Sequence, residues 1–108
     1  MNARDLIEAI EQAISEAGEQ VRRSQSNYAR ATDVCNDAYH ELERADVNED
    51  NAYDFVLKAR ELLRARRDAK GEYTINCKVL EAAKASLKDV KAALNHAEST
   101  HRRITSGE

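Results

Sequence analysis

Hydrophobic residues recur at a 3.5-residue spacing along the first 45 residues of the chain. With Ile7 taken as position a of a heptad, eleven of the twelve a and d positions are apolar or aromatic, and the remaining one, Ser24, is small. A stripe of this regularity predicts a long helix in a coiled coil. The a positions are Ile7, Ile14, Val21, Tyr28, Cys35 and Leu42, and the d positions are Ile10, Ala17, Ser24, Ala31, Ala38 and Ala45.

A second stripe follows in a different heptad phase. Its a positions are Ala52, Ala59, Arg66, Tyr73, Leu80, Leu87, Leu94 and His101, and its d positions are Phe55, Leu62, Ala69, Asn76, Ala83, Val90, Ala97 and Ile104. The stripe is apolar at both ends and contains the polar residues Arg66 and Asn76 near its middle. The periodicity predicts a second long helix.

The change of phase coincides with the segment DVNED, residues 46–50. Asp46 and Asn48 are favourable N-cap residues, and the acidic residues that follow suit the positive end of a helix dipole. We therefore expect one helix over about 3–46, a turn over about 47–50 and a second helix over about 51–104, with the two helices as antiparallel neighbours. The fold class is all-α, a long two-helix hairpin in one domain spanning residues 1–108.

The same segment partly matches the calcium loop of an EF-hand. Asp46, Asn48, Asp50 and Asp54 occupy loop positions 1, 3, 5 and 9. Two further positions of the loop require Gly and a bidentate Glu, whereas this sequence has Asn51 and Leu57 there. A capped turn is the preferred interpretation.

A three-helix bundle with a break near Gly71 is the alternative fold. The heptad phase continues through Gly71, and one exposed glycine costs a helix only about 1 kcal/mol. Folding the chain once pairs residues whose numbers sum to about 97, so that Cys35 lies opposite Leu62 and large side chains face small ones. The three-helix alternative would instead bring Cys35 and Cys77 together.

Composition excludes several classes of function. Charged residues make up 34% of the 108 residues, and the net charge is only −3. There is no glycine-rich phosphate loop, and the three histidines and two cysteines lack metal-ligand spacing. We expect no enzymatic activity, no cofactor, no metal and no small-molecule substrate.

Without a membrane-length apolar run or a secretory leader, and with two cysteines, we expect a cytoplasmic protein with free thiols.

Apolar positions also lie beside the predicted a/d stripes, among them Val34, Val56 and Leu63. A two-helix hairpin has a thin core, so these positions favour dimerisation into a four-helix bundle or docking on another protein. The second helix is about ten residues longer than the first, and its tail, with Leu94 and Ile104, is expected to overhang.

The leading hypothesis is a non-enzymatic protein–protein interaction module. An adaptor, an assembly factor or a small inhibitor of a larger complex fits this description, and so does an accessory protein of a mobile element. The alternative is a nucleic-acid-binding hairpin dimer that uses the basic cluster Arg60–Lys70. The candidate partner-binding residues are Tyr28, Arg60, Arg64, Arg66, Arg67, Tyr73, Leu94, His101 and Ile104.

Overall fold

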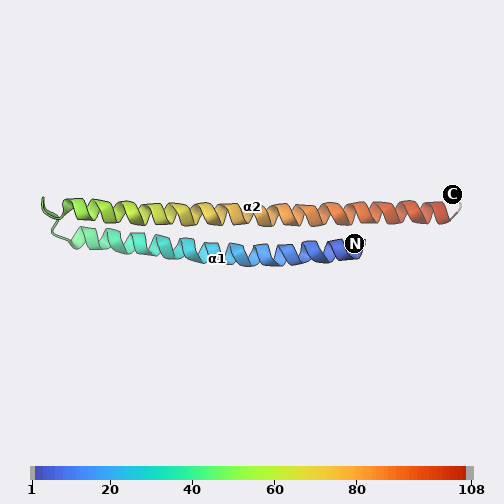
Figure 1. Ribbon diagram of the computed structural model, residues 1–108, viewed down its shortest axis with the longest axis horizontal. Helices are drawn as coiled ribbons and strands as arrows, with labels where there is room; N and C mark the ends of the chain where they lie inside the picture. The colour runs from blue at the N-terminus through green and yellow to red at the C-terminus, as the bar shows by residue number, and fades with distance from the viewer. Residues whose placement is uncertain (1, 107–108) are drawn as a thin grey trace. The chain divides into compact units, whose positions relative to one another are not determined.

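A computed structural model describes residues 2–106 of the chain, and these residues form two long helices (Figure 1). Helix α1 spans Ala3–Arg44 and helix α2 spans Ala52–Thr105. No strand occurs within residues 2–106. The predicted all-α fold with two long helices is therefore confirmed.

Helix α2 continues without interruption through Gly71, so the alternative with a break at this residue is wrong. A Cβ atom added at Gly71 would meet nothing within 4 Å. The glycine is thus tolerated at an exposed position and does not end the helix. Cys35 and Cys77 are both free and half-buried.

The turn between the helices is closed by a reciprocal pair of asparagine side chains. Oδ1 of Asn48 accepts hydrogen bonds from the backbone N–H groups of Asp50 at 2.9 Å and Asn51 at 3.2 Å. Oδ1 of Asn51 in turn accepts a hydrogen bond from the Asn48 N–H at 2.8 Å. This is the geometry of a capping box, with Asn in both roles. The Asn51 amide also donates to the Asp46 carbonyl at 3.0 Å, which holds the chain after α1 against the start of α2.

Both helix starts are therefore fixed by asparagine. Asn2 caps α1, since its Oδ1 accepts a hydrogen bond from the Asp5 N–H at 2.9 Å. Helix α1 ends at Arg44, two residues before the predicted end, because the backbone from Asp46 onward is engaged by the capping box. The sequence favours α2 at this point because Asn48 satisfies N–H groups that the first helical turn leaves unpaired.

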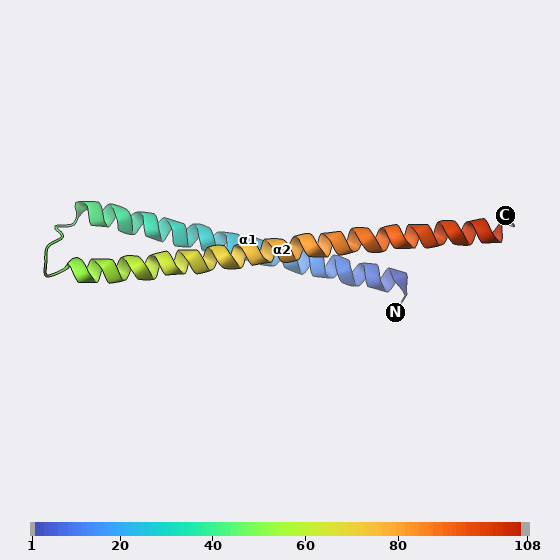
Figure 2. The same cartoon turned by 90° about the horizontal axis from the view of Figure 1, so that it is seen from above.

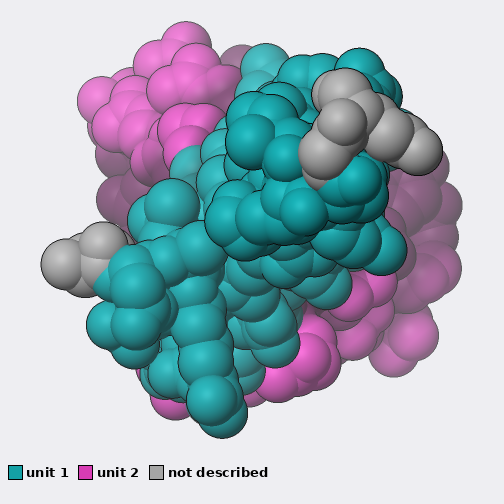
Figure 3. All heavy atoms as spheres, turned by 90° about the vertical axis from the view of Figure 1, so that its right-hand side faces the viewer, with its two compact units in different colours: residues 1–19, 77–108 teal, residues 20–76 magenta. Residues whose placement is uncertain are grey.

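Contacts between residues divide the chain into two compact units, coloured separately in Figure 3. The bend unit is Gln20–Asn76, and the terminal unit combines Met1–Glu19 with Cys77–Glu108. Each helix contributes one segment to each unit.

Within the bend unit, the two helical segments run antiparallel and touch at several levels. The Cys35 thiol donates a hydrogen bond to the Leu62 carbonyl at 3.3 Å, as the predicted pairing of these two residues requires. Nearer the turn, Lys58 Nζ lies 3.7 Å from Glu41 Oε2. In the view of Figure 2, a gap between the two segments is visible near the turn.

Burial follows the predicted stripes, but it is shallow. In the terminal unit the half-buried side chains include Ile7, Ile10, Ile14, Ala17, Leu80, Ala83, Leu87 and Val90. In the bend unit Ser24 is buried, with 2% of its surface exposed. No hydrophobic residue within 2–106 is buried to the same degree. Two helices alone leave one side of most seam residues open to solvent.

Candidate interaction surface

The polar residues near the middle of both stripes lie in or beside the seam of the bend unit. The rings of Tyr28 and Tyr73 are 6.4 Å apart between centroids, with planes inclined at 35°. This distance is within the range of favourable aromatic pairs. Arg66 and Asn76 are half-buried in the same stripe of α2 as Tyr73. The structure therefore brings together two of the predicted partner-binding residues, Tyr28 and Tyr73, across the seam.

Ser24 has its hydrogen-bonding needs met inside its own helix. Its Oγ donates to the Gln20 carbonyl at 2.8 Å, and the Val21 carbonyl also lies within hydrogen-bond distance at 3.1 Å. A small hydroxyl at this d position lets the helices approach closely without an unpaired polar atom. Ser24 thus serves packing and presents no group to a ligand.

The predicted basic cluster is divided between different sides of α2. Arg66 is half-buried in the seam, whereas Arg60, Arg64 and Arg67 are exposed. Consecutive helical residues diverge by about 100°, so neighbours in sequence cannot share one side. Arg60, Arg64 and Arg67 lie within an arc of about 60° on the exposed side of α2. Arg67 Nε also lies 3.8 Å from the Asp68 carboxylate.

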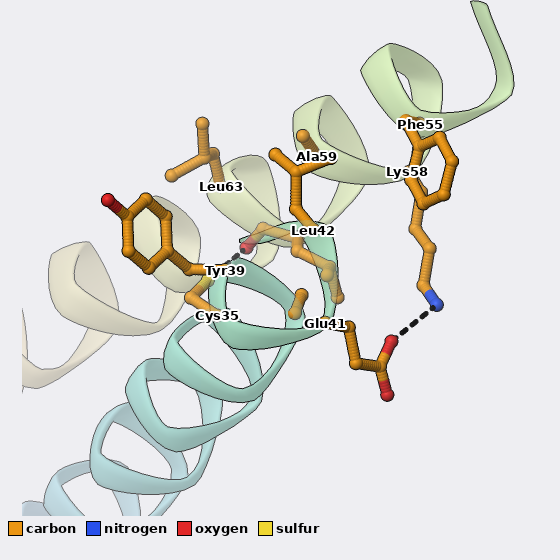
Figure 4. Close-up of a pocket in the computed structure, with 10 residues that line it drawn as sticks. Cys35, Tyr39, Glu41, Leu42, Phe55, Lys58, Ala59 and Leu63 are labelled. Carbon is orange, nitrogen blue, oxygen red and sulfur yellow. Dashed lines mark hydrogen bonds and ion pairs between the residues drawn. The ribbon is translucent and has the colours of Figure 1, made fainter. Parts of the chain in front are cut away.

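A hollow of about 170 Å³ opens between the helices near the turn (Figure 4). It arises because Ala38 and Ala59 are too small to fill the space where the two segments separate. The side chains of Tyr39 and Leu63 stand at one edge, and the Glu41–Lys58 ion pair stands at another. The lining residues are Cys35, Ala38, Tyr39, Glu41, Leu42, Phe55, Lys58, Ala59, Leu62 and Leu63.

A second hollow lies further along the bend unit and is lined in part by Tyr28, Thr32 and Tyr73. Thr32 and Tyr39 are seven residues apart on α1 and therefore lie on the same side of that helix. Both hollows are therefore lined from the same side of α1. We call the side that carries Thr32, Tyr39, Val56 and Leu63 the groove side.

Exposed large hydrophobic side chains are concentrated in the bend unit, which contains nine of the twelve in residues 2–106. Exposed apolar side chains that gather on one side, as Tyr39 and Leu63 do at the first hollow, mark interaction sites. Tyr39, with 61% of its surface exposed, was absent from the predicted partner-binding residues. Its position beside the a/d stripe, like those of Val56 and Leu63, was the available signal. The nine residues are Val34, Tyr39, Leu42, Val47, Tyr53, Val56, Leu57, Leu63 and Ile75.

The predicted overhang belongs to the terminal unit. Helix α2 has 54 residues and α1 has 42, and in Figure 1 the end of α2 extends past the start of α1. Leu94 is half-buried, His101 is exposed, and Ile104 has 71% of its surface exposed. These three predicted residues therefore lie apart in sequence from the tyrosines and arginines of the bend unit, on a segment with little cover.

Within residues 2–106, no three His, Cys, Asp or Glu side chains are grouped so that they could hold a metal ion. Neither α1 nor α2, as far as the structure describes them, has an apolar stretch of the length needed to cross a membrane. Comparisons of the chain with protein-family models, with curated proteins and with solved structures find no match.

Proposed function

We propose that this chain is a non-enzymatic protein–protein interaction module that docks a helical surface on other proteins. The observation that carries the proposal is the shallow core: no hydrophobic residue within 2–106 is buried, while twelve large ones are exposed. A small domain is marginally stable unless it removes most of its apolar surface from water. A second protein surface would complete this burial.

The chemistry of the hollows supports a binding role. The walls of the first hollow are mainly aliphatic and aromatic, and the second combines two tyrosines with polar side chains. Grooves of this type accept an apolar face of another helix. An adaptor, an assembly factor and a small inhibitor of a larger complex all act through such a surface.

Self-association into a four-helix bundle is part of this proposal, and the terminal unit supplies the reason. The positions that flank the seam on one side of this unit carry no charge, and they are exposed: Leu6, Ala13, Val79, Ser86 and Ala93. The opposite side has Arg4, Glu11, Lys84 and Lys91. An uncharged side with small residues suits close packing against its own copy across a two-fold axis.

Sedimentation equilibrium of the full chain tests the self-association. We expect a dimer at micromolar concentration for the wild-type chain and a monomer for Val79→Glu, which places a charge in the uncharged side. Leu57→Glu is the matched control, since it makes the same kind of change on α2 outside that side, and it should remain dimeric. A wild-type monomer, or equal behaviour of the two variants, would contradict this part of the proposal.

Nucleic-acid binding is the competing outcome. The exposed arginines would then hold phosphates, and binding would weaken steeply with salt. We expect the chain to elute from heparin below about 150 mM salt, because Arg66 is half-buried in the seam and the exposed arginines are accompanied by carboxylates such as Asp68. Retention above that concentration, abolished in the double variant Arg64→Glu with Arg67→Glu, would favour a nucleic-acid partner.

A further inference from the structure

The groove side of the bend unit carries a second heptad-like stripe on α2. Val56, Arg60, Leu63, Arg67 and Lys70 follow one another at spacings of four, three, four and three residues. On a helix these positions fall within an arc of about 80°. Val56 and Leu63 have 49% and 50% of their surfaces exposed, and the three cationic residues are exposed as well. Apolar and positive side chains therefore alternate along one accessible line.

The opposite rim of the groove, on α1, differs in charge. Gln25, Thr32 and Asn36 are uncharged, Asp33 lines the second hollow, and Glu43, at the end near the turn, lies 3.6 Å from His40. Between the rims lie the ring of Tyr39 and the hollow that it lines with Leu63. The groove side thus has an apolar floor and a line of cations on α2, whereas its α1 rim carries uncharged and acidic side chains.

We infer that this groove binds an acidic amphipathic helix of another protein. The inference rests on the proposed interaction function and deepens it by specifying the chemistry of the partner. Apolar residues of the partner would pack against Tyr39, Val56 and Leu63, and carboxylates on one of its flanks would meet Arg60 and Arg67. The spacing of the stripe matches the repeat with which one helix contacts another. Complementary charge along the rim fixes the register and orientation of the bound helix.

A second copy of the chain fits this groove poorly. A two-fold axis near Leu63 would place Arg60 of each copy opposite Arg67 of the other, and like charges in contact disfavour association. A nucleic-acid strand fits poorly for a different reason. Its phosphates would match the arginines, but they would leave Val56 and Leu63 facing a charged backbone.

The direct test uses two fluorescein-labelled peptides about three heptads long, both with Leu at the a and d positions. One peptide has Glu along one flank of the leucines and the other has Lys at the same places. Binding to the full chain is followed by fluorescence anisotropy at about 50 mM salt. We expect the Glu peptide to bind at least about tenfold more tightly than the Lys peptide, and the ratio to fall as salt is raised.

Charge reversal supplies the decisive comparison. In the double variant Arg60→Glu with Arg67→Glu, the chain should bind the Lys peptide more tightly than the Glu peptide. Arg30→Glu is the control: Arg30 is an exposed arginine of the same unit, nine residues from Tyr39 and so half a turn around α1 from the groove side. This variant should keep the wild-type preference within about twofold. Equal responses of the groove and control variants would overturn the inference.

A second pair of measurements separates a helix from a nucleic acid. The double variant Val56→Ser with Leu63→Ser should lower the affinity for the Glu peptide by about tenfold or more, because the apolar contacts are lost. Helicity measured by circular dichroism should be unchanged, since both side chains are half exposed. Tighter binding of a labelled DNA duplex than of the Glu peptide, with no response to these serine variants, would overturn the inference in favour of phosphate binding.

The outcomes also separate this inference from the interaction function on which it rests. If neither peptide binds but the wild-type chain is dimeric in sedimentation, the groove assignment fails and the interaction function stands. If neither peptide binds and the chain is monomeric, both fail.

Discussion

The bend unit and the terminal unit are built from the same two helices, but their seams are filled differently. The terminal seam uses large aliphatic residues such as Ile10, Ile14 and Leu87, with few large hydrophobic residues exposed around it. The bend seam uses alanines, a cysteine and polar residues, leaves a hollow, and exposes nine large hydrophobic side chains. We infer that the terminal unit contributes most of the free energy that holds the two helices together. The bend unit instead keeps apolar surface available for a partner.

The largest expected effect comes from the terminal seam. Ile10→Ala with Leu87→Ala should lower the free energy of unfolding by about 2–4 kcal/mol, since each change removes several methylene-sized groups from a half-buried contact. Urea denaturation followed by circular dichroism measures the loss. The matched double variant in the bend unit, Leu42→Ala with Leu62→Ala, should lose roughly half as much because it enlarges an existing hollow. Equal losses of unfolding free energy in the two double variants would contradict the claim that the terminal seam contributes more to stability.

The turn should show the next largest effect. Asn48→Ala removes the acceptor for two backbone N–H groups and should lower the unfolding free energy by about 1 kcal/mol. Asn51→Ala should cost a similar amount, because the other half of the capping box is lost. Asn48→Asp keeps an acceptor oxygen and should retain wild-type thermal stability. A neutral Asn48→Ala variant would show that the turn is held by something other than these side chains.

A stabilising change is expected at the polar centre of the bend seam. Arg66→Leu replaces a half-buried cation at an a position with an apolar residue and should raise the free energy of unfolding by about 0.5–1 kcal/mol. The sedimentation profile of this variant should also broaden, because polar a positions restrict oligomeric state and register. A loss of stability would instead indicate that Arg66 makes a favourable contact within the seam.

The smallest effect is expected at the Glu41–Lys58 pair. Their side chains are 70% and 62% exposed, so water screens their attraction. Lys58→Ala should change the free energy of unfolding by less than about 0.5 kcal/mol. The same urea titration measures this change. A larger loss would mean that this pair, rather than the hydrophobic seam, sets the spacing of the helices near the turn.

The seam was predictable from the sequence because burial in a helix pair follows a fixed repeat. Nearly every predicted a and d position from Ile7 to Ala45 and from Ala52 to Val90 is half-buried. Leu42 and Ala59 are exposed, and they lie where the hollow opens. The turn was predictable from Asn48, but the reciprocal role of Asn51 was not, since it depends on how the chain leaves α1.

The candidate site was only partly predictable. The basic cluster was identified from adjacent residues, and the rotation of the helix then separated Arg66 from Arg60 and Arg67. The groove side was missed because Tyr39 and Leu63 lie beside the stripe, and their importance depends on the separation of the helices near the turn. The hollow there depends on the small size of Ala38 and Ala59, which a periodicity analysis counts simply as apolar.

Backbone hydrogen exchange of the full chain, with and without the Glu-flanked peptide, tests the central claim most directly. The account predicts that the bound peptide slows exchange at Tyr39–Leu42 and Val56–Arg67, where the groove side lies, and leaves Leu6–Ala13 and Val79–Ala93 unchanged. Slower exchange confined to the terminal unit, or no change anywhere at saturating peptide, would contradict the assignment of the bend unit as the binding half of the molecule.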